Sequence, residues 1–292
     1  MRTVTSKDGT TIAFEKVGSG PAVILINGAM SYRRAFDTTL EDLAELLSKG
    51  FTVYDFDRRG RGESTDNTDV KSFTKEREIE DIQALVEDAG GEAMIVGFSS
   101  GGCVTLETTA VTPGITKALV YEVPFIVDDS RQPLADYEGH TTKLVAEGKF
   151  DELIEYFITV VAGIPAEFVG DIKQDQAMWA RMRAIAPTIP HDAAFMSEFM
   201  KGKPLPTGYW DKVKVPVLVG DGGASPAWLR NAAEALGKEL PHASRETFEG
   251  QTHSFDPQVL APVLIEFLSA SNGAKPKKSS RRRVATKANM EK

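Results

Sequence analysis

The chain has 292 residues, of which 41% are hydrophobic, and a formal net charge of −8 at pH 7. This length and apolar content suit one large domain, and no run approaches the roughly 18 consecutive apolar residues that a membrane span requires. A single cysteine, Cys103, excludes an internal disulfide framework and a thiolate cluster for a metal.

Charge is distributed unevenly along the chain. Residues 272–292 contain eight Lys or Arg residues and one acid, so this segment has a charge of +7 and the rest of the chain −15. The strongly acidic charge of residues 1–271, called the body below, disfavours nucleic-acid binding. We expect any affinity for nucleic acid to reside in the basic segment. Because the segment lacks apolar periodicity, we expect a disordered tail, either a solvated extension or an arm for localisation or polyanion binding. The first residues lack the apolar core of a signal peptide, so we expect a cytoplasmic protein.

The rest of the chain alternates short β-rich runs with amphipathic helical stretches. This order is typical of a mostly parallel sheet covered by helices on both faces. Near the start, Arg2–Ser6 and Thr10–Val17 are joined through Asp8-Gly9 and predict an antiparallel hairpin at the sheet edge. The continuous apolar run Ala22–Ile26 then predicts a strand buried on both faces.

The same order of strand, turn and helix is repeated downstream. Apolar positions recur at helical spacing within Ala35–Leu47, and Phe51–Phe56 predicts the next strand. That strand ends in an Arg- and Gly-rich turn, Asp57–Ser64, before another helical stretch. Ala93–Val96 predicts a further strand that leads directly into a second Gly-rich turn.

The second half of the chain predicts the remaining strands and covering helices. Strands are expected at Lys117–Val123, Val215–Val219 and Arg245–Phe248, and helices at Ala227–Leu240 and Val259–Leu268. The interval between the first two of these strands contains helical stretches, such as Leu144–Val160, but little strand pattern. We therefore predict an α/β core formed by residues 1–125 and 213–271, an inserted helical lid at 126–212 and a tail at 272–292.

The turn after the Ala93–Val96 strand has the pattern of a catalytic nucleophile. Gly97-Phe98-Ser99-Ser100-Gly101 matches G-x-S-x-G, and it follows a buried strand and opens a helix, which is the context of a nucleophile elbow. The glycines permit a strained turn that presents the Ser99 hydroxyl above the sheet edge. The sequence therefore predicts Ser99 as the nucleophile rather than a buried turn serine.

A nucleophile of this kind requires donors for the oxyanion that forms when it attacks a carbonyl. The amide of Ser100, just after the nucleophile, is one expected donor. The loop after the strand Ala22–Ile26 is expected to supply the other, because Gly28 permits close approach and the Ala29 amide can point inward.

A serine hydroxyl also needs a base, and histidine titrates in the right range. Of four histidines, His140 and His191 fall in the predicted lid, and His242 precedes the last strand. His253 alone lies in the loop after the final strand, which brings it to the carboxyl edge of the sheet beside the elbow. We therefore predict His253 as the general base.

With these residues identified, the chain resembles the α/β-hydrolase family from Arg2 to about Ser269. The resemblance rests on the elbow Gly97–Gly101, on the terminal loop Gly250–His253 and on the turn Asp57–Ser64, which resembles the family's D-x-R-G-x-G-x-S loop. Asn27-Gly28 departs from the His-Gly of many members. The resemblance implies an α/β-hydrolase fold with an inserted lid and a Ser-His-acid triad.

Two carboxylates are candidates for the acid of this triad. Family members usually place the acid a few residues past the strand that is here Pro216–Val219, but that slot holds Ser225. Some branches, including certain haloalkane dehalogenases and the fungal zearalenone lactonases, use a glutamate at the end of the preceding strand, where this chain has Glu122. We favour Glu122, because a carboxylate in an apolar strand needs a cationic partner such as the imidazolium of His253. Asp221 is the alternative acid.

These residues predict acyl transfer without a cofactor or metal: a serine hydrolase that cleaves a small-molecule carboxylic ester or lactone. Two other functions are compatible with the same fold. A cofactor-free oxygenase or perhydrolase uses a similar set of side chains, and a small-molecule receptor retains the set with slow turnover.

Overall fold

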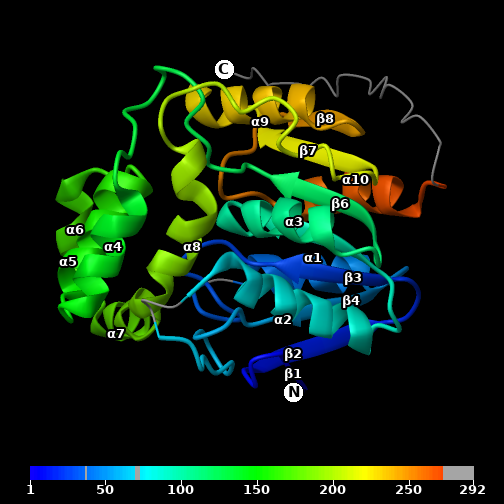
Figure 1. Cartoon of the computed structure of the whole chain (residues 1–292), viewed down its shortest axis with the longest axis horizontal. Coiled ribbons are helices and arrows are strands. Elements are labelled where there is room, and N and C mark those ends of the chain that lie inside the picture. Colours follow the sequence, from blue (N-terminus) through cyan, green and yellow to red (C-terminus); the bar gives the residue numbers. More distant parts are fainter. Residues whose placement is uncertain (37, 70–72, 272–292) are drawn as a thin grey trace, which may run out of the picture.

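The computed structural model describes residues 1–36, 38–69 and 73–271; the predicted basic tail, 272–292, lies outside the described residues. The described chain forms an eight-stranded sheet in the order β1-β2-β4-β3-β5-β6-β7-β8 (Figure 1). The strands are β1 (Arg2–Thr5), β2 (Thr11–Gly18), β3 (Ala22–Ile26), β4 (Thr52–Phe56), β5 (Ala93–Phe98), β6 (Ile115–Tyr121), β7 (Val217–Gly222) and β8 (Ala243–Phe248). Strand β2 pairs antiparallel with β1 and β4, and all other neighbours are parallel. The predicted edge hairpin and mostly parallel sheet are confirmed.

Helices cover both faces of this sheet. They are α1 (Thr39–Leu47), α2 (Lys75–Asp88), α3 (Ser100–Val111), α9 (Ala227–Glu239) and α10 (Pro257–Ser269). Alternate side chains of β3 belong to two different cores: Val23 and Leu25 pack with α1 and α10, whereas Ile24 and Ile26 belong to the core with α2, α3 and α9. Burial on both faces explains the continuous apolar run of β3. Across the described ranges, no helix combines the length and apolar character needed to cross a membrane.

A helical region is inserted between β6 and β7. It contains α4 (Tyr137–Ala146), α5 (Phe150–Tyr156), α6 (Val169–Gln174), α7 (Gln176–Ile185) and α8 (Ile189–Met196), with a π-helical turn at Phe157–Val161 and 3₁₀ turns at Ala166–Phe168, Ala186–Thr188 and Ser197–Phe199. Figure 1 shows α4 to α7 standing beyond one end of the sheet, and α8 packs on both α4 and α3. The predicted helical insertion is confirmed over residues 137–199, and its outer bounds at 126 and 212 stay a prediction.

Two helix boundaries differ from those that periodicity predicts. The helix expected within Ala35–Leu47 begins only at Thr39, because residues 33–36 form turns and bends, with a φ of 57° at Arg34. The stretch Leu144–Val160 is divided between α4 and α5 at Gly148, whose φ of 68° lies in the left-handed region that ends a helix.

The last helix is fixed at both ends. Asp256 accepts a hydrogen bond from the Gln258 amide at 2.8 Å, and Pro257 occupies the first helical position. At the other end, the buried Lys117 Nζ of β6 donates to the carbonyls of Phe267 at 2.9 Å and Leu268 at 2.8 Å. This lysine therefore satisfies carbonyls that have no partner within α10.

Candidate active site

Ser99 lies at the sharp turn between β5 and α3. Its backbone has φ 54° and ψ −125°, which is a strained conformation for a residue other than glycine. The turn depends on a glycine two residues earlier, because a Cβ at Gly97 would lie 2.1 Å from Thr105 Oγ1. The Ser99 side chain is only partly buried. The turn thus has the backbone form expected of a nucleophile elbow.

Glu122 directly follows β6 and is the carboxylate that contacts His253. Its side chain has no exposed surface, and Oε2 lies 2.9 Å from His253 Nδ1. Its other oxygen, Oε1, accepts a hydrogen bond from the Gly222 amide at 2.8 Å. An ionised carboxylate can only accept, so this contact places the proton of a neutral imidazole on Nδ1 and leaves the Nε2 lone pair free. The imidazole is thereby in the tautomer that can act as a base.

The loop that carries His253 follows β8 and is held against the strands next to it. Tyr121, the last residue of β6, donates its hydroxyl to the Thr252 carbonyl at 2.7 Å. Phe255 stacks on Phe98, the residue before the elbow, with ring centroids 4.9 Å apart. Half of the His253 side-chain surface is exposed, so the imidazole lies at the sheet edge within reach of a ligand.

Asp221, the alternative acid, has other partners. Its two oxygens accept hydrogen bonds from Arg245 Nε at 2.9 Å and Arg245 Nη2 at 3.1 Å, and Thr247 Oγ1 lies 3.2 Å from Oδ1. Both partners belong to β8, beside β7. Ser225, which occupies the usual acid position of the resembled family, is buried, and its hydroxyl has no partner among the described residues. The structure therefore brings Glu122, and not Asp221, to His253.

The loop after β3 passes close to the elbow. A Cβ at Gly28 would lie 3.1 Å from Ser99 Cβ and 3.3 Å from the Phe98 carbonyl oxygen, so only glycine fits without displacing the neighbouring serine. The backbone hydrogen bonds of the described chain leave the amides of Ala29 and Ser100 without an acceptor. The two predicted oxyanion donors are thus unpaired amides, one on each of two adjacent turns.

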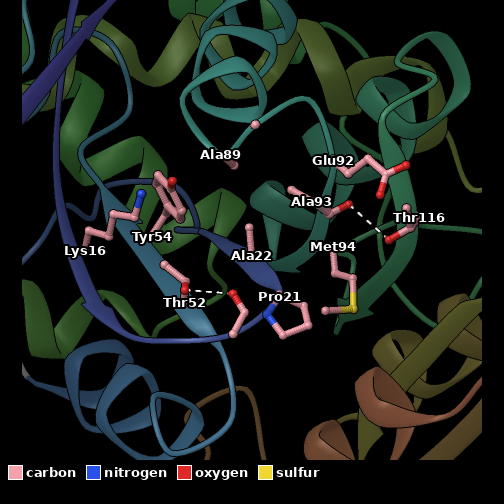
Figure 2. Close-up of a pocket in the computed structure, with 12 residues that line it drawn as sticks. Lys16, Pro21, Ala22, Thr52, Tyr54, Ala89, Glu92, Ala93, Met94 and Thr116 are labelled. Carbon is pink, nitrogen blue, oxygen red and sulfur yellow. Dashed lines mark hydrogen bonds between the residues drawn. The ribbon is translucent and has the colours of Figure 1, made fainter.

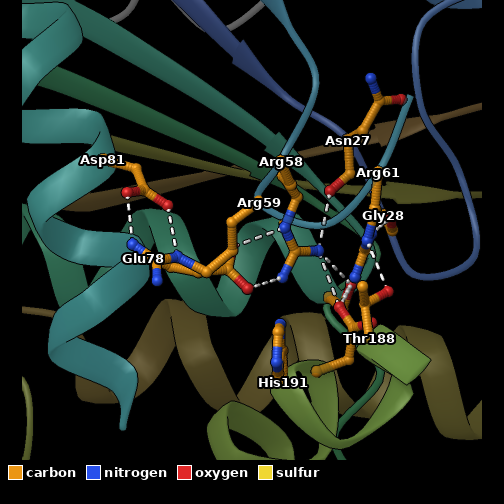
Figure 3. A network of polar contacts seen from close by, with 12 residues as sticks. Asn27, Gly28, Arg58, Arg59, Arg61, Glu78, Asp81, Thr188 and His191 are labelled. Atoms are coloured by element: carbon orange, nitrogen blue, oxygen red, sulfur yellow. Dashed lines mark hydrogen bonds and ion pairs between the residues drawn. The ribbon is translucent and has the colours of Figure 1, made fainter. Parts of the chain in front are cut away.

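A buried ionic network lies beside these turns (Figure 3). Arg58 binds Glu78 through Nε at 2.7 Å and Nη2 at 2.8 Å, and its Nη1 lies 2.7 Å from Asp192 Oδ1. Arg61 Nη2 contacts the other oxygen of Asp192 at 2.6 Å. Burial alone would raise the pKa of Asp192, but the guanidinium groups of Arg58 and Arg61 lower it below its ordinary value. The network therefore joins the turn after β4 to helix α8 of the inserted region by paired charges.

Sequence reasoning identified the Asp57–Ser64 turn but did not predict this network. The available signal was an acid, Asp192, within the mostly apolar stretch Ile189–Met196, because a buried carboxylate requires a cationic partner. The neighbouring His191 is also buried and stacks on Phe73 at 3.8 Å, and burial lowers its pKa to about 4. Among the residues that the structure describes, no three His, Cys, Asp or Glu side chains are grouped so as to hold a metal ion.

A cavity of about 400 Å³ lies at the amino ends of the parallel strands (Figure 2). Its lining includes Ala22, Thr52 and Ala93, which are the first residues of β3, β4 and β5. Ser99 and Glu122, in contrast, follow the last residues of β5 and β6. The cavity and the candidate active site therefore lie at opposite ends of the strands. Ligands of open α/β sheets bind at the carboxyl ends, where Ser99 and Glu122 are, so the cavity is separate from the candidate active site.

Comparison with known proteins shows which family the chain resembles along its length. The model of the alpha/beta hydrolase family matches residues 23–263. The solved structure of an alpha/beta hydrolase from Sphaerobacter thermophilus is 43% identical with a TM-score of 0.80, and the match covers 92% of this chain and 100% of that one. A zearalenone hydrolase from Cladophialophora bantiana is 27% identical over 272 residues, which cover 90% of this chain and 95% of the relative. An enol-lactonase from Burkholderia xenovorans shares the fold at 16% identity, with a TM-score of 0.61 and coverage of 92% and 100%.

The match spans the elbow, the strand ends that carry Glu122 and Asp221, and the loop that contains His253. It also spans the inserted helices between β6 and β7, so the predicted fold class is confirmed. The chain belongs to the alpha/beta hydrolase family.

Proposed function

We propose that this protein is a serine hydrolase that cleaves a carboxylic ester or lactone through an acyl-enzyme on Ser99. The observation that carries the proposal is the 2.9 Å contact between Glu122 Oε2 and His253 Nδ1, next to an elbow whose serine has a positive φ. A buried carboxylate that orients a half-exposed imidazole at the same sheet edge as an elbow serine supports acyl transfer, because that reaction needs a nucleophile, a base and an acid that orients the base.

The reaction proceeds in two halves, and every step uses groups of the chain and water. In the first half, Ser99 Oγ attacks the carbonyl carbon, His253 Nε2 takes the hydroxyl proton, and the amides of Ala29 and Ser100 stabilise the oxyanion. The imidazolium then gives its proton to the leaving alcohol as the ester bond breaks. Glu122 remains ionised and stabilises the imidazolium throughout.

In the second half, His253 takes a proton from water, and the resulting hydroxide attacks the acyl carbon. The bond to Ser99 Oγ breaks, the serine recovers its proton from the imidazolium, and the carboxylic acid leaves. With a lactone, the alcohol and the acid are two ends of one product, so the ring opens without loss of a fragment.

Two comparisons support this substrate class. The relative from Cladophialophora bantiana is a zearalenone hydrolase, and the structure from Burkholderia xenovorans is an enol-lactonase. The resemblance to zearalenone lactonases also implies an acid at Glu122 rather than one after β7. We therefore propose esters and lactones of small molecules as substrates, with the inserted helices acting as a lid.

The test is hydrolysis of a panel of p-nitrophenyl esters and aryl lactones by the wild type and three variants at one pH near neutrality. Ser99→Ala removes the nucleophile, and we expect no turnover above background. Glu122→Gln keeps the shape of the side chain but removes the charge that orients and stabilises the imidazole, so we expect kcat to fall by about 10²–10⁴-fold. Asp221→Asn is the matched control, because it removes a buried carboxylate that contacts Arg245 rather than His253. It should lower stability and leave kcat within a few-fold.

A large loss of activity confined to Asp221→Asn would move the acid to that residue. Full activity in Ser99→Ala would overturn the proposal and favour an oxygenase on the same fold. Stabilisation by an ester or lactone without product formation would favour a small-molecule receptor.

A further inference from the structure

The peptide between Gly28 and Ala29 combines a fixed carbonyl with a free donor. A peptide unit is planar and trans, so its C=O and N–H groups point in opposite directions. The Gly28 carbonyl accepts a hydrogen bond from Arg61 Nη1 at 2.8 Å. That bond fixes the plane of the peptide, and with it the direction in which the Ala29 amide points.

Arg61 is itself held from three directions. The side chain has no exposed surface, Nη2 lies 2.6 Å from Asp192 Oδ2, and Nε donates to Thr188 Oγ1 at 3.0 Å. The Thr188 hydroxyl in turn donates to the Ile185 carbonyl at 2.8 Å. The planar guanidinium therefore cannot rotate away from Gly28 without breaking contacts to the inserted region (Figure 3).

The Asp192 carboxylate, which holds Arg61, also contacts the elbow. Asp192 Oδ1 accepts a hydrogen bond from Ser100 Oγ at 2.7 Å, and Arg58 Nη1 lies 3.2 Å from that hydroxyl. Arg58 Nη1 is also 3.2 Å from the Asn27 carbonyl oxygen. Asp192 is thus linked to the turns that present both oxyanion donors, through a hydroxyl on one side and through arginines on the other.

A cation on the carbonyl side of a peptide also strengthens its N–H as a donor. The guanidinium draws electron density toward the Gly28 oxygen, and hydrogen bonds in such a chain polarise one another in a buried environment. A fixed and polarised donor needs no reorganisation when negative charge develops on a substrate carbonyl.

We infer that Arg61, held by Asp192 of the inserted region, is a positioning residue that orients and polarises the Gly28–Ala29 peptide for oxyanion stabilisation. The inference rests on the proposed function, since it concerns how the oxyanion of that reaction is bound. It assigns a role to a position of the Asp57–Ser64 turn that the D-x-R-G-x-G-x-S pattern leaves open.

The test compares two charge-balanced pairs of substitutions in the same turn. Arg61→Met with Asp192→Asn removes the proposed device and leaves the Arg58–Glu78 pair intact. Arg59→Met with Asp81→Asn removes an equally buried pair, with contacts of 2.6 and 2.8 Å, that does not touch the β3 loop or the elbow. The readouts are kcat and KM on the best ester, and the inhibition constant of a trifluoromethyl ketone, which forms an oxyanion adduct with the serine.

We expect the first pair to lower kcat by about 10²-fold with little change in KM, and to raise the inhibition constant of the ketone in parallel. The second pair should lower the unfolding temperature by a similar amount without changing kcat or the inhibition constant of the ketone. A role in folding alone predicts no such split between kcat and KM. Unchanged kcat and ketone inhibition in a folded Arg61→Met/Asp192→Asn protein would overturn the inference.

Arg61→Lys is the second variant, for the case in which the first pair fails to fold. It keeps a positive charge beside Asp192 but loses the fork that reaches Gly28 and Thr188 together, so we expect kcat to fall about tenfold or more. If the activity of the wild type depends on Ser99, an unchanged kcat in Arg61→Lys overturns this inference but leaves the proposed function standing. A wild type that hydrolyses no ester or lactone, or full activity in Ser99→Ala, overturns the proposed function and this inference together.

Discussion

Glu122 and Ser99 both adopt backbone conformations that are unfavourable for their residue types, with φ values of 49° and 54°. Each directly follows a parallel strand, β6 or β5, where the chain must turn at the edge of the sheet. Glu122 has the additional cost of a fully buried carboxylate, which is offset by hydrogen bonds to both of its oxygens. Two of the four non-glycine residues with positive φ in the described chain are therefore candidate catalytic residues at neighbouring strand ends, which agrees with the proposed site, because backbone strain is common where function requires it.

Asp55 is another buried carboxylate, and one of its oxygens lacks a hydrogen-bond donor within the described ranges. Oδ1 has no partner among the described residues, and burial, together with the charge of Glu41, raises its pKa from 3.8 to about 7. Between these values the folded chain binds more protons than the unfolded chain. The stability that protonated Asp55 contributes is therefore complete below about pH 4 and is lost as pH rises through 7.

We expect Asp55→Asn to stabilise the protein at pH 8.5 by about 2–4 kcal/mol relative to the wild type, and by much less at pH 5, because asparagine does not ionise. Urea unfolding at the two pH values measures this difference. Asp57→Asn is the control, since Asp57 accepts hydrogen bonds from the Arg33 amide at 2.9 Å and from Arg33 Nη2 at 3.0 Å. It should destabilise at both pH values. A gain from Asp55→Asn that is the same at both would show that the carboxylate does not titrate in this range.

At the scale of elements, the sequence predicts the strands better than the inserted helices. Strands β3 and β5 are nearly continuous apolar runs, and their two-sided burial makes the pattern unambiguous. The inserted helices are short, and turns such as the one at Gly148 interrupt apolar spacing that would otherwise indicate one long helix. The interaction of Lys117 with the end of α10 is also invisible to local pattern, because its partners lie about 150 residues later in the chain.

Lys117 links strand β6 to the carboxyl end of α10, where helix carbonyls and the helix dipole favour a cation. We expect Lys117→Met to reduce the free energy of unfolding by about 1–3 kcal/mol, because buried carbonyls lose their donor. Lys238→Met on α9 is the matched control: its contact with Glu234 at 2.7 Å is exposed, and its loss should cost less than about 0.5 kcal/mol. Urea denaturation measures both, and equal losses would refute a capping role for Lys117.

At the scale of the whole molecule, the sequence predicts the fold and the order of the site residues but not every contact between them. Glu122 and Asp221 both lie at ends of neighbouring strands, so strand pattern alone could not choose between them. The choice depends on two residues of β8 that bind Asp221: Thr247, which lies opposite it, and Arg245, which lies opposite Val219. The Arg58–Asp192 contact is harder still to predict, because it joins residues 134 positions apart across the insertion.

The division of charge between body and tail leads to a last prediction. Residues 272–292 bring +7 to a chain whose remainder has −15, so we expect any attraction to nucleic acid to come from this segment. We expect a chain truncated after Ser271 to keep the kcat/KM of the full chain, since every proposed catalytic residue and all of α10 precede the cut.

The truncated chain should also show no affinity for duplex DNA in fluorescence anisotropy at low salt. Binding by the full chain, where it is seen, should weaken steeply with salt, as release of counterions from phosphates requires. Arg281→Gln, Arg282→Gln and Arg283→Gln in one full-length variant keep the length of the tail while lowering its charge, so they separate charge from chain length. DNA binding that survives truncation would place the affinity on the acidic body and contradict the electrostatic argument.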